Sequence, residues 1–245
     1  MQSDHHHQKG STDMKFFRSQ VFFRPGLLLA AMAFLTPSAA LSDTVVLTSL
    51  GNSMDDVSQV RSAAWIANSF ITDTNAWRLN SVEISMFAAS NSSGNFFLSI
   101  WSDNGAGTAP GSQLEVLSGT SNPNPGTGSA NFSYTAAGSG LSVDPTTKYW
   151  VVAGVTAGPS SYNWNFSYNP NPTALGVWSI PLVATYVFST DQAATWLSPA
   201  GGDPYMFAIN ATLATVPEPS TWVMGLAGAT CASWGAMRRR TRTTC

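Results

Sequence analysis

The chain has 245 residues, of which only 10% are charged, and a formal net charge of −2. Its three histidines lie at 5–7 and its two cysteines are Cys231 and Cys245, so residues 43–215 contain neither type. This excludes Ser-His-Asp and Cys-His catalysis, His or Cys metal sites and disulfides within that region, and we expect no cofactor. The region carries three basic and ten acidic residues. Nucleic acid is therefore not expected as a partner, because phosphate binding needs clustered Lys and Arg.

The N-terminal region, 1–42, is typical of a leader that ends in a secretory signal peptide. Basic residues precede an apolar segment at 26–35, and a run of small residues at 36–42 follows it. The true start is open between Met1 and Met14. Because the leader is removed on export, it takes no part in the fold of the mature protein.

The exported region, 43–215, has about 170 residues, which suits one domain with a sizeable core. Short runs of alternating apolar and polar residues, rich in β-branched and aromatic types, recur between Gly, Pro, Asn and Asp. They predict strands at Thr44–Ser49, Ala63–Thr72, Trp77–Ala88, Phe96–Ser102, Gln113–Leu117, Ala130–Thr135, Tyr149–Val155, Tyr162–Tyr168, Val177–Ile180, Ala184–Ser189 and Tyr205–Leu213. About ten strands without a convincing helix predict an all-β fold, an antiparallel β-sandwich of jelly-roll type.

Two stretches of this region have distinctive patterns. The strand at 96–102 has bulky residues on both faces, which predicts burial between the sheet and a covering loop. The stretch 169–172 is Asn-Pro-Asn-Pro, and it must leave the sheet because two prolines remove two donors from the hydrogen-bond ladder.

A family resemblance appears around these strands. The strand at 96–102 runs into Asp103-Asn104-Gly105 and a Pro-Gly-Ser turn at 110–112, and a second stretch at 141–152 contains Asp144-Pro145 and then Tyr149-Trp150 of the next strand. This order resembles the choice-of-anchor R domain, a family defined by its occurrence with different surface-anchoring tails. The resemblance covers most of Thr44 to Leu213. It implies a surface protein and no particular activity.

Aromatic residues are the strongest candidates for ligand binding in the exported region. Tyr162, Trp164 and Tyr168 lie in a segment that has an aromatic residue at every second position, with Asn or Ser between. Exposed rings of this kind stack on sugar faces, which would make the domain a carbohydrate-binding module for exopolysaccharide. The alternative is that the rings fill the core of a sandwich that has no disulfides.

Acidic residues give two weaker candidates. Asp103-Asn104-Gly105 offers oxygen ligands for calcium, but the same residues form an ordinary turn in which Asp and Asn accept hydrogen bonds from their own backbone, and we favour the turn. Glu83 and Glu115 are the only glutamates of the exported region. A hydrolase would need them about 5–10 Å apart, and Glu83 is on the polar phase of its strand. We therefore expect that the protein is not an enzyme.

The C-terminal region, 216–245, has three parts. Two prolines at its start predict an extended, exposed neck. The uncharged run that follows reaches about 26 Å as a helix, slightly less than the hydrocarbon core of a bilayer, and the arginines after it would stay on the cytoplasmic side. The three parts are the motif Val216, Pro217, Glu218, Pro219, Ser220, Thr221, the apolar run Thr221–Met237, and the basic residues Arg238, Arg239, Arg240 and Arg242.

This three-part order resembles the PEP-CTERM sorting signal of bacterial exported proteins. The resemblance implies recognition of Pro217, Glu218 and Pro219 by an exosortase, a membrane-embedded enzyme that supplies the catalytic residues. It implies a non-catalytic surface or extracellular-matrix protein, exported by the secretion machinery and transiently anchored in the inner membrane by one C-terminal helix. An ordinary tail anchor with a proline-rich linker is the alternative.

Overall fold

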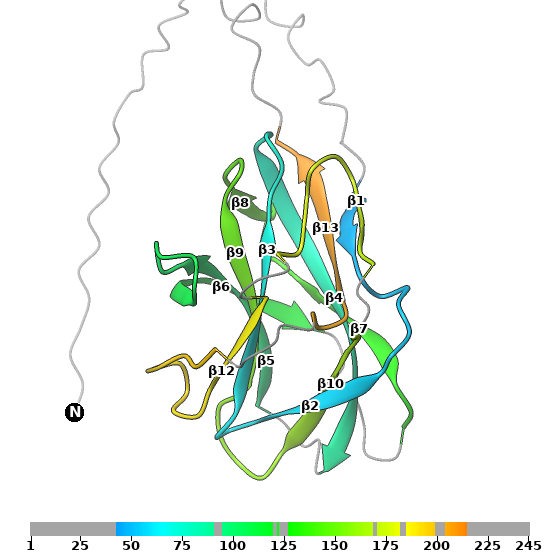
Figure 1. The fold of residues 1–245 in the computed structure, drawn as a ribbon, viewed down its shortest axis with the longest axis vertical. Helices are drawn as coiled ribbons and strands as arrows, with labels where there is room; N and C mark the ends of the chain where they lie inside the picture. The colour runs from blue at the N-terminus through cyan, green and yellow to red at the C-terminus, as the bar shows by residue number, and fades with distance from the viewer. Residues whose placement is uncertain are drawn as a thin grey trace, which may run out of the picture. The chain divides into compact units, whose positions relative to one another are not determined.

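The computed structural model describes residues 43–90, 95–119, 122, 127–168, 171–181, 185–198 and 204–214. Within these ranges, thirteen strands form one curled antiparallel sheet (Figure 1). The predicted signal helix, the predicted transmembrane helix and the sorting motif lie outside the described residues. In the part of the chain that is described, no helix has the length and apolar character needed to cross a membrane.

The strands confirm the prediction of an all-β fold. In chain order they are β1 (Thr44–Thr48), β2 (Asp56–Arg61), β3 (Trp65–Ile71), β4 (Trp77–Ser90), β5 (Phe96–Asp103), β6 (Pro110–Gly119), β7 (Ala130–Thr135), β8 (Leu141–Val143), β9 (Lys148–Val155), β10 (Ser161–Phe166), β11 (Thr173–Ala174), β12 (Tyr186–Ser189) and β13 (Phe207–Leu213).

One half of the sheet is organised around β4, a strand of 14 residues. Along one edge β4 pairs first with β13 and then, beyond Ile84, with β10; along the other edge it pairs with β8 and β7. β1 lies outside β13, β11 lies outside β1, and β2 lies outside β10. We call this part the β4 half. It holds both the first and the last strand of the domain.

The other half has the strand order β12, β3, β9, β5 and β6, and we call it the β9 half. Ile66 of β3 and Leu98 of β5 both lie opposite Ala153 of β9, so these three strands are in register at the centre of the half. At its end β6 leaves β5 and pairs with β7 through Ser118 and Gly119. This short pairing joins the two halves, so that the sheet curls back on itself.

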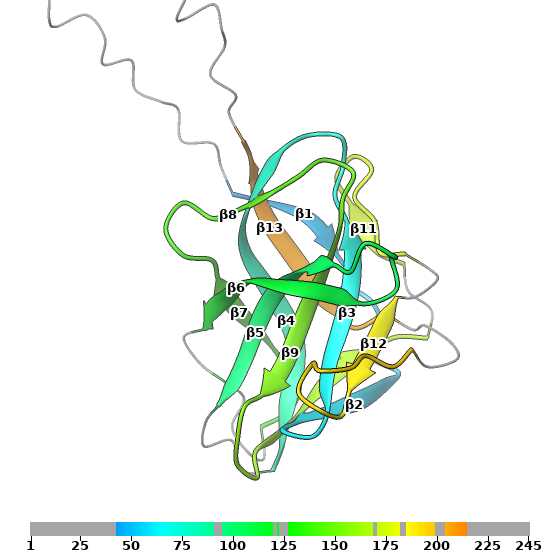
Figure 2. The same ribbon diagram turned by 90° about the vertical axis from the view of Figure 1, so that its left-hand side faces the viewer.

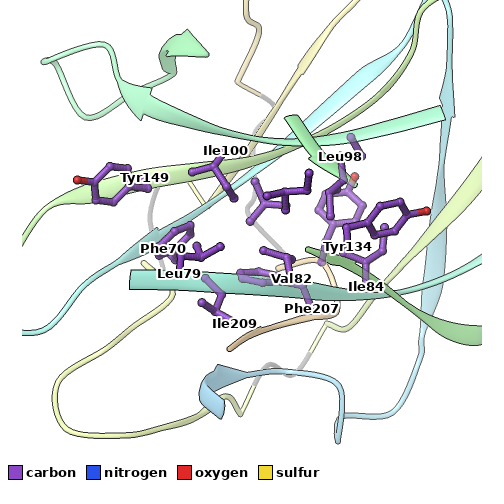
Figure 3. Close-up of a cluster of buried hydrophobic side chains, with 14 of the residues drawn as sticks. Phe70, Leu79, Val82, Ile84, Leu98, Ile100, Tyr134, Tyr149, Phe207 and Ile209 are labelled. Atoms are coloured by element: carbon purple, nitrogen blue, oxygen red, sulfur yellow. The ribbon is translucent and has the colours of Figure 1, made fainter. Parts of the chain in front are cut away.

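The main core lies between the two halves. Val82 and Phe207 of the β4 half point toward Leu98 and Ile100 of the β9 half (Figure 3), and all four side chains have no exposed surface. Because side chains alternate along a strand, every second residue of each half contributes to this core. Full burial of such a side chain stabilises the fold by about 1.5–3 kcal/mol.

Three short strands differ from the predictions, and one predicted strand is wrong. β2, β8 and β11 were not predicted, while Val177–Ile180 forms a turn and a single bridge between Ser179 and Ile71. The physical reason is Trp178, whose buried ring lies 5.8 Å from Trp77 and fills the end of the core from a turn rather than from a strand. Pro172 lies outside the sheet, between β10 and β11, as the sequence predicts, whereas Pro170 is outside the described residues.

Candidate functional site

The structure corrects the predicted stacking role of two residues on β10. Tyr162 and Trp164 have no exposed surface, because β10 lies between β2 and β4 and turns its aromatic phase toward the core. The ring of Trp164 lies 4.7 Å from that of Tyr205, and its Nε1 donates a hydrogen bond to the Met206 carbonyl at 3.0 Å. Neither ring has a face that a ligand can reach.

Tyr168, the third predicted stacking residue, lies beyond the end of β10 and is 53% exposed. Its backbone N–H donates to Asp55 Oδ2 at 2.7 Å, and its hydroxyl donates to Asp56 Oδ2 at 3.2 Å. Its ring packs edge-on against Phe166 at 5.4 Å. A stacking role for Tyr168 stays a prediction.

A second aromatic cluster lies on the side of the β9 half that faces away from the main core, and we call it the outer aromatic face. The strands β3, β5 and β9 of this half lie toward the viewer in Figure 2. It exists because β9 is apolar on both of its phases: Val151 and Ala153 face the main core, so Trp150 and Val152 face outward. The aromatic residues of the face are Trp65, Phe97, Trp101, Trp150 and Trp196.

Close contacts fix the rings of the outer aromatic face. Trp65 and Phe97 meet edge to face at 4.7 Å, and Trp101 meets Trp196 at 6.2 Å in the same manner. Gly154 lies under the first pair, where an added Cβ would come within 2.5 Å of the Phe97 ring. Trp101 Nε1 donates to Ser99 Oγ at 2.9 Å. The absence of a side chain at Gly154 thus lets the Phe97 ring lie against β9.

Asp103 forms the predicted turn, and its oxygens are engaged by the protein itself. Oδ2 accepts hydrogen bonds from the N–H groups of Gly105 and Gly107, both with positive φ, and Oδ1 accepts one from Trp150 Nε1 at 3.0 Å. Lys148 Nζ lies 4.7 Å above the Trp150 ring and donates to the Gly107 carbonyl; burial lowers the pKa of this amine, and Asp103 partly offsets the effect. Among the described residues, no three His, Cys, Asp or Glu side chains are grouped to hold a metal.

The segment after β12, residues 190–197, covers part of the outer aromatic face. Asp191 accepts hydrogen bonds from Thr195 Oγ1 and N and from Ser189 Oγ, and these bonds lower its pKa to about 2. Gln192, at φ 58°, reaches the Ser62 carbonyl with its side chain. These contacts close the segment into a compact loop that places Trp196 against Trp101.

The face is only partly covered. Phe97, Trp101 and Trp196 are half-buried, whereas Leu114 and Val116 on the neighbouring β6 are exposed. The arrangement offers fixed ring surfaces and apolar side chains. It can bind a ligand by stacking and apolar contact.

The two glutamates considered for hydrolysis do not face one another. Glu83 lies between Val82 and Ile84, which point into the core, so its side chain is on the outer side of the β4 half. Glu115 is opposite Ile100 in the β9 half, and its carboxylate accepts a hydrogen bond from the Ala137 N–H. The two side chains therefore lie on opposite faces of the curled sheet.

Comparison with models of known protein families finds no match, and no curated protein is similar to this sequence.

The sequence-based prediction selected none of the aromatic residues of the outer aromatic face as ligand-binding candidates. One signal could have found part of the face: the bulk on both sides of 96–102, where Phe97 and Trp101 alternate with Leu98 and Ile100. The prediction that a loop covers this strand is confirmed by Trp196. The meeting of Trp101 with Trp196 is long-range and has no local signal.

Proposed function

We propose that the chain is a non-catalytic exported bacterial surface or extracellular-matrix protein, sorted by an exosortase that recognises its PEP-CTERM tail. The observation that carries the proposal is the tail itself, in which the Pro-Glu-Pro neck, the apolar run and the arginines follow one another within 216–242. The sequence outside the domain thus has the parts that export and sorting require.

The arrangement of the domain supports this proposal. All thirteen strands lie between Thr44 and Leu213, so removal of the leader and of the tail takes no described strand from the sheet. Thr44 of β1 is paired with Ala211 of β13, which puts the start and the end of the domain side by side. Leader and tail are then attached at one end of the domain, as suits a protein held to a membrane by each in turn.

We also infer that the curled sheet is an antiparallel β-sandwich of jelly-roll type, related to the choice-of-anchor R domain. What supports this is the main core, to which the β4 half and the β9 half contribute from opposite sides. The crossing of β6 from β5 to β7 gives the strand exchange between layers that such folds use.

Cell fractionation tests the sorting proposal. In an exosortase-bearing host that exports the protein, the full chain should be found in the envelope or the medium. A variant that ends at Ala214 should still be exported, but it should be recovered in the soluble periplasmic fraction. If both forms distribute alike among the fractions, the tail does not direct sorting.

A second candidate function is carbohydrate binding, and the outer aromatic face favours it. Phe97, Trp101 and Trp196 are partly open and held rigidly, next to apolar side chains on β6. The net charge of −7 for residues 43–215 disfavours acidic polymers, so the ligand class is a neutral exopolysaccharide.

A further inference from the structure

The end of the domain where β1 begins and β13 ends carries four exposed apolar residues, and we call it the terminal end (Figure 1). Val177 is 63% exposed, the largest fraction among the large hydrophobic residues of the described chain. The others are Val45, Leu175 and Leu213, at 51%, 47% and 43%.

Backbone pairing brings these four residues to one end. The Leu175 N–H donates to the Val46 carbonyl at 2.8 Å, which places Leu175 opposite Val46, the residue that follows Val45. Leu213 lies opposite Trp77, and the Trp77 ring touches that of Trp178, next to Val177. The patch is therefore contributed by β1, β13 and the turn after β11.

The turn fixes the outward direction of Val177. Gly176 has φ 62°, a conformation that most side chains disfavour, and Trp178 is buried against Phe70 and Trp77. With Trp178 held in the core, its neighbour Val177 is presented to the outside. The packing of the domain itself therefore leaves Val177 uncovered.

The length of the neck indicates what covers this end. Six residues, 215–220, separate Ala214 from the apolar run that begins at Thr221. Fully extended, six residues span at most about 20 Å. A tail inserted in a bilayer would therefore hold the terminal end close to the lipid headgroups.

We propose that, in the unprocessed precursor, the terminal end rests on the lipid surface, with Val177, Leu175 and Val45 in contact with the interfacial region. This inference rests on the proposed insertion of the tail and adds to it a defined orientation of the domain. The outer aromatic face, on the side of the β9 half, then stays open to the extracellular space.

The charges at the terminal end indicate which kind of lipid surface it can contact. Asp43 and Asp144 are exposed there, Arg78 is half-buried, and Asp73 is buried with its carboxylate bonded to Trp77 Nε1. No basic cluster is present among the described residues of this end to select anionic lipids. Contact therefore depends on apolar burial, and we expect it on zwitterionic lipid and at high salt alike.

The test places a dye on the full chain in phosphatidylcholine vesicles, with nitroxide-labelled headgroups as quencher. Leu175→Cys and Leu197→Cys are matched positions, because the exposed fractions of the two leucines are 47% and 48%. They lie at opposite ends of β3: Leu197 is bridged to Phe188, which pairs with Ile66 at the start of β3, whereas the turn that follows Leu175 is bridged to Ile71 at its end. Cys231→Ser and Cys245→Ser remove the native thiols. Flotation of the vesicles measures insertion independently.

We expect the fluorescence of the Leu175→Cys dye to fall to less than half when the nitroxide lipid is present, in low and high salt, and that of the Leu197→Cys dye to change little. Equal quenching at both positions in protein that floats with the vesicles would overturn the inference and leave the proposed anchoring intact. Failure of the chain to float would reject the anchoring and the inference together.

Discussion

At the scale of single residues, the same ring type has opposite environments on different strands. Trp164 alternates with asparagines on β10, yet it is buried, because a second layer closes over its phase. Trp101 alternates with Ile100 and Ser102 on β5 and is half-buried, because the loop that carries Trp196 covers it only in part. Its ring is thus the better candidate to meet a flat apolar ligand.

The Trp101→Ala variant should bind a neutral exopolysaccharide about two- to tenfold more weakly, because an aromatic contact contributes about 0.5–1.5 kcal/mol beyond its buried area. Isothermal titration with the isolated polymer measures the change. Tyr168→Ala is the matched control at the other exposed ring, and circular dichroism verifies that both variants fold. Binding that survives Trp101→Ala but is lost in Tyr168→Ala would move the site to the end of β10.

At the scale of elements, the loop at 190–197 shows how hydrogen bonds hold a covering segment in place. The carboxylate of Asp191 satisfies the N–H and hydroxyl of Thr195 and the hydroxyl of Ser189, and the loop then presents Trp196. These bonds stabilise the ionised form of the carboxyl group, which is why its pKa is lowered.

Asp191 should titrate at about 2 in the folded protein, below its ordinary value of 3.8. Because the folded-state pKa is the lower one, the contribution of Asp191 to stability is complete above 3.8 and is lost as the pH falls toward 2. Carboxyl NMR measures the midpoint. Thr195→Val removes one hydrogen-bond donor and should raise the midpoint of Asp191. A midpoint near 3.8 in the native protein would show that the hydrogen bonds do not hold in solution.

The elements also show how far sequence patterns reach. Ten of the predicted strands overlap observed ones, because alternation is a local property that survives folding. β2 was missed because its two valines, Val57 and Val60, are three residues apart and do not alternate. The strand prediction at Val177–Ile180 was wrong because Trp178 fills the core from a turn. The predicted stacking roles of Tyr162 and Trp164 were wrong for a related reason. β10 is an interior strand, and no local pattern reveals which strands have a layer above them.

At the scale of the whole molecule, we propose a domain that is held to the membrane at one end while its side stays accessible. A leader, a domain and a sorting tail in this chain order remain a prediction from the sequence. The neighbouring positions of β1 and β13 could not be predicted, since they depend on pairing between distant residues. That pairing puts Thr44 beside Ala211, so the proposed leader and tail would both join the domain at the terminal end. The outer aromatic face belongs to the other half of the sheet, so anchoring and ligand binding need not compete.

The measurement that tests the central claim most directly is the intact mass of the protein purified from a host with and without an exosortase. Recognition of the Pro217-Glu218-Pro219 neck predicts a shorter species that has lost everything beyond about Pro219, formed only when the enzyme is present. Persistence of the full tail in the membrane under both conditions would contradict the sorting proposal. The neck would then be a linker, and the protein an ordinary tail-anchored surface domain.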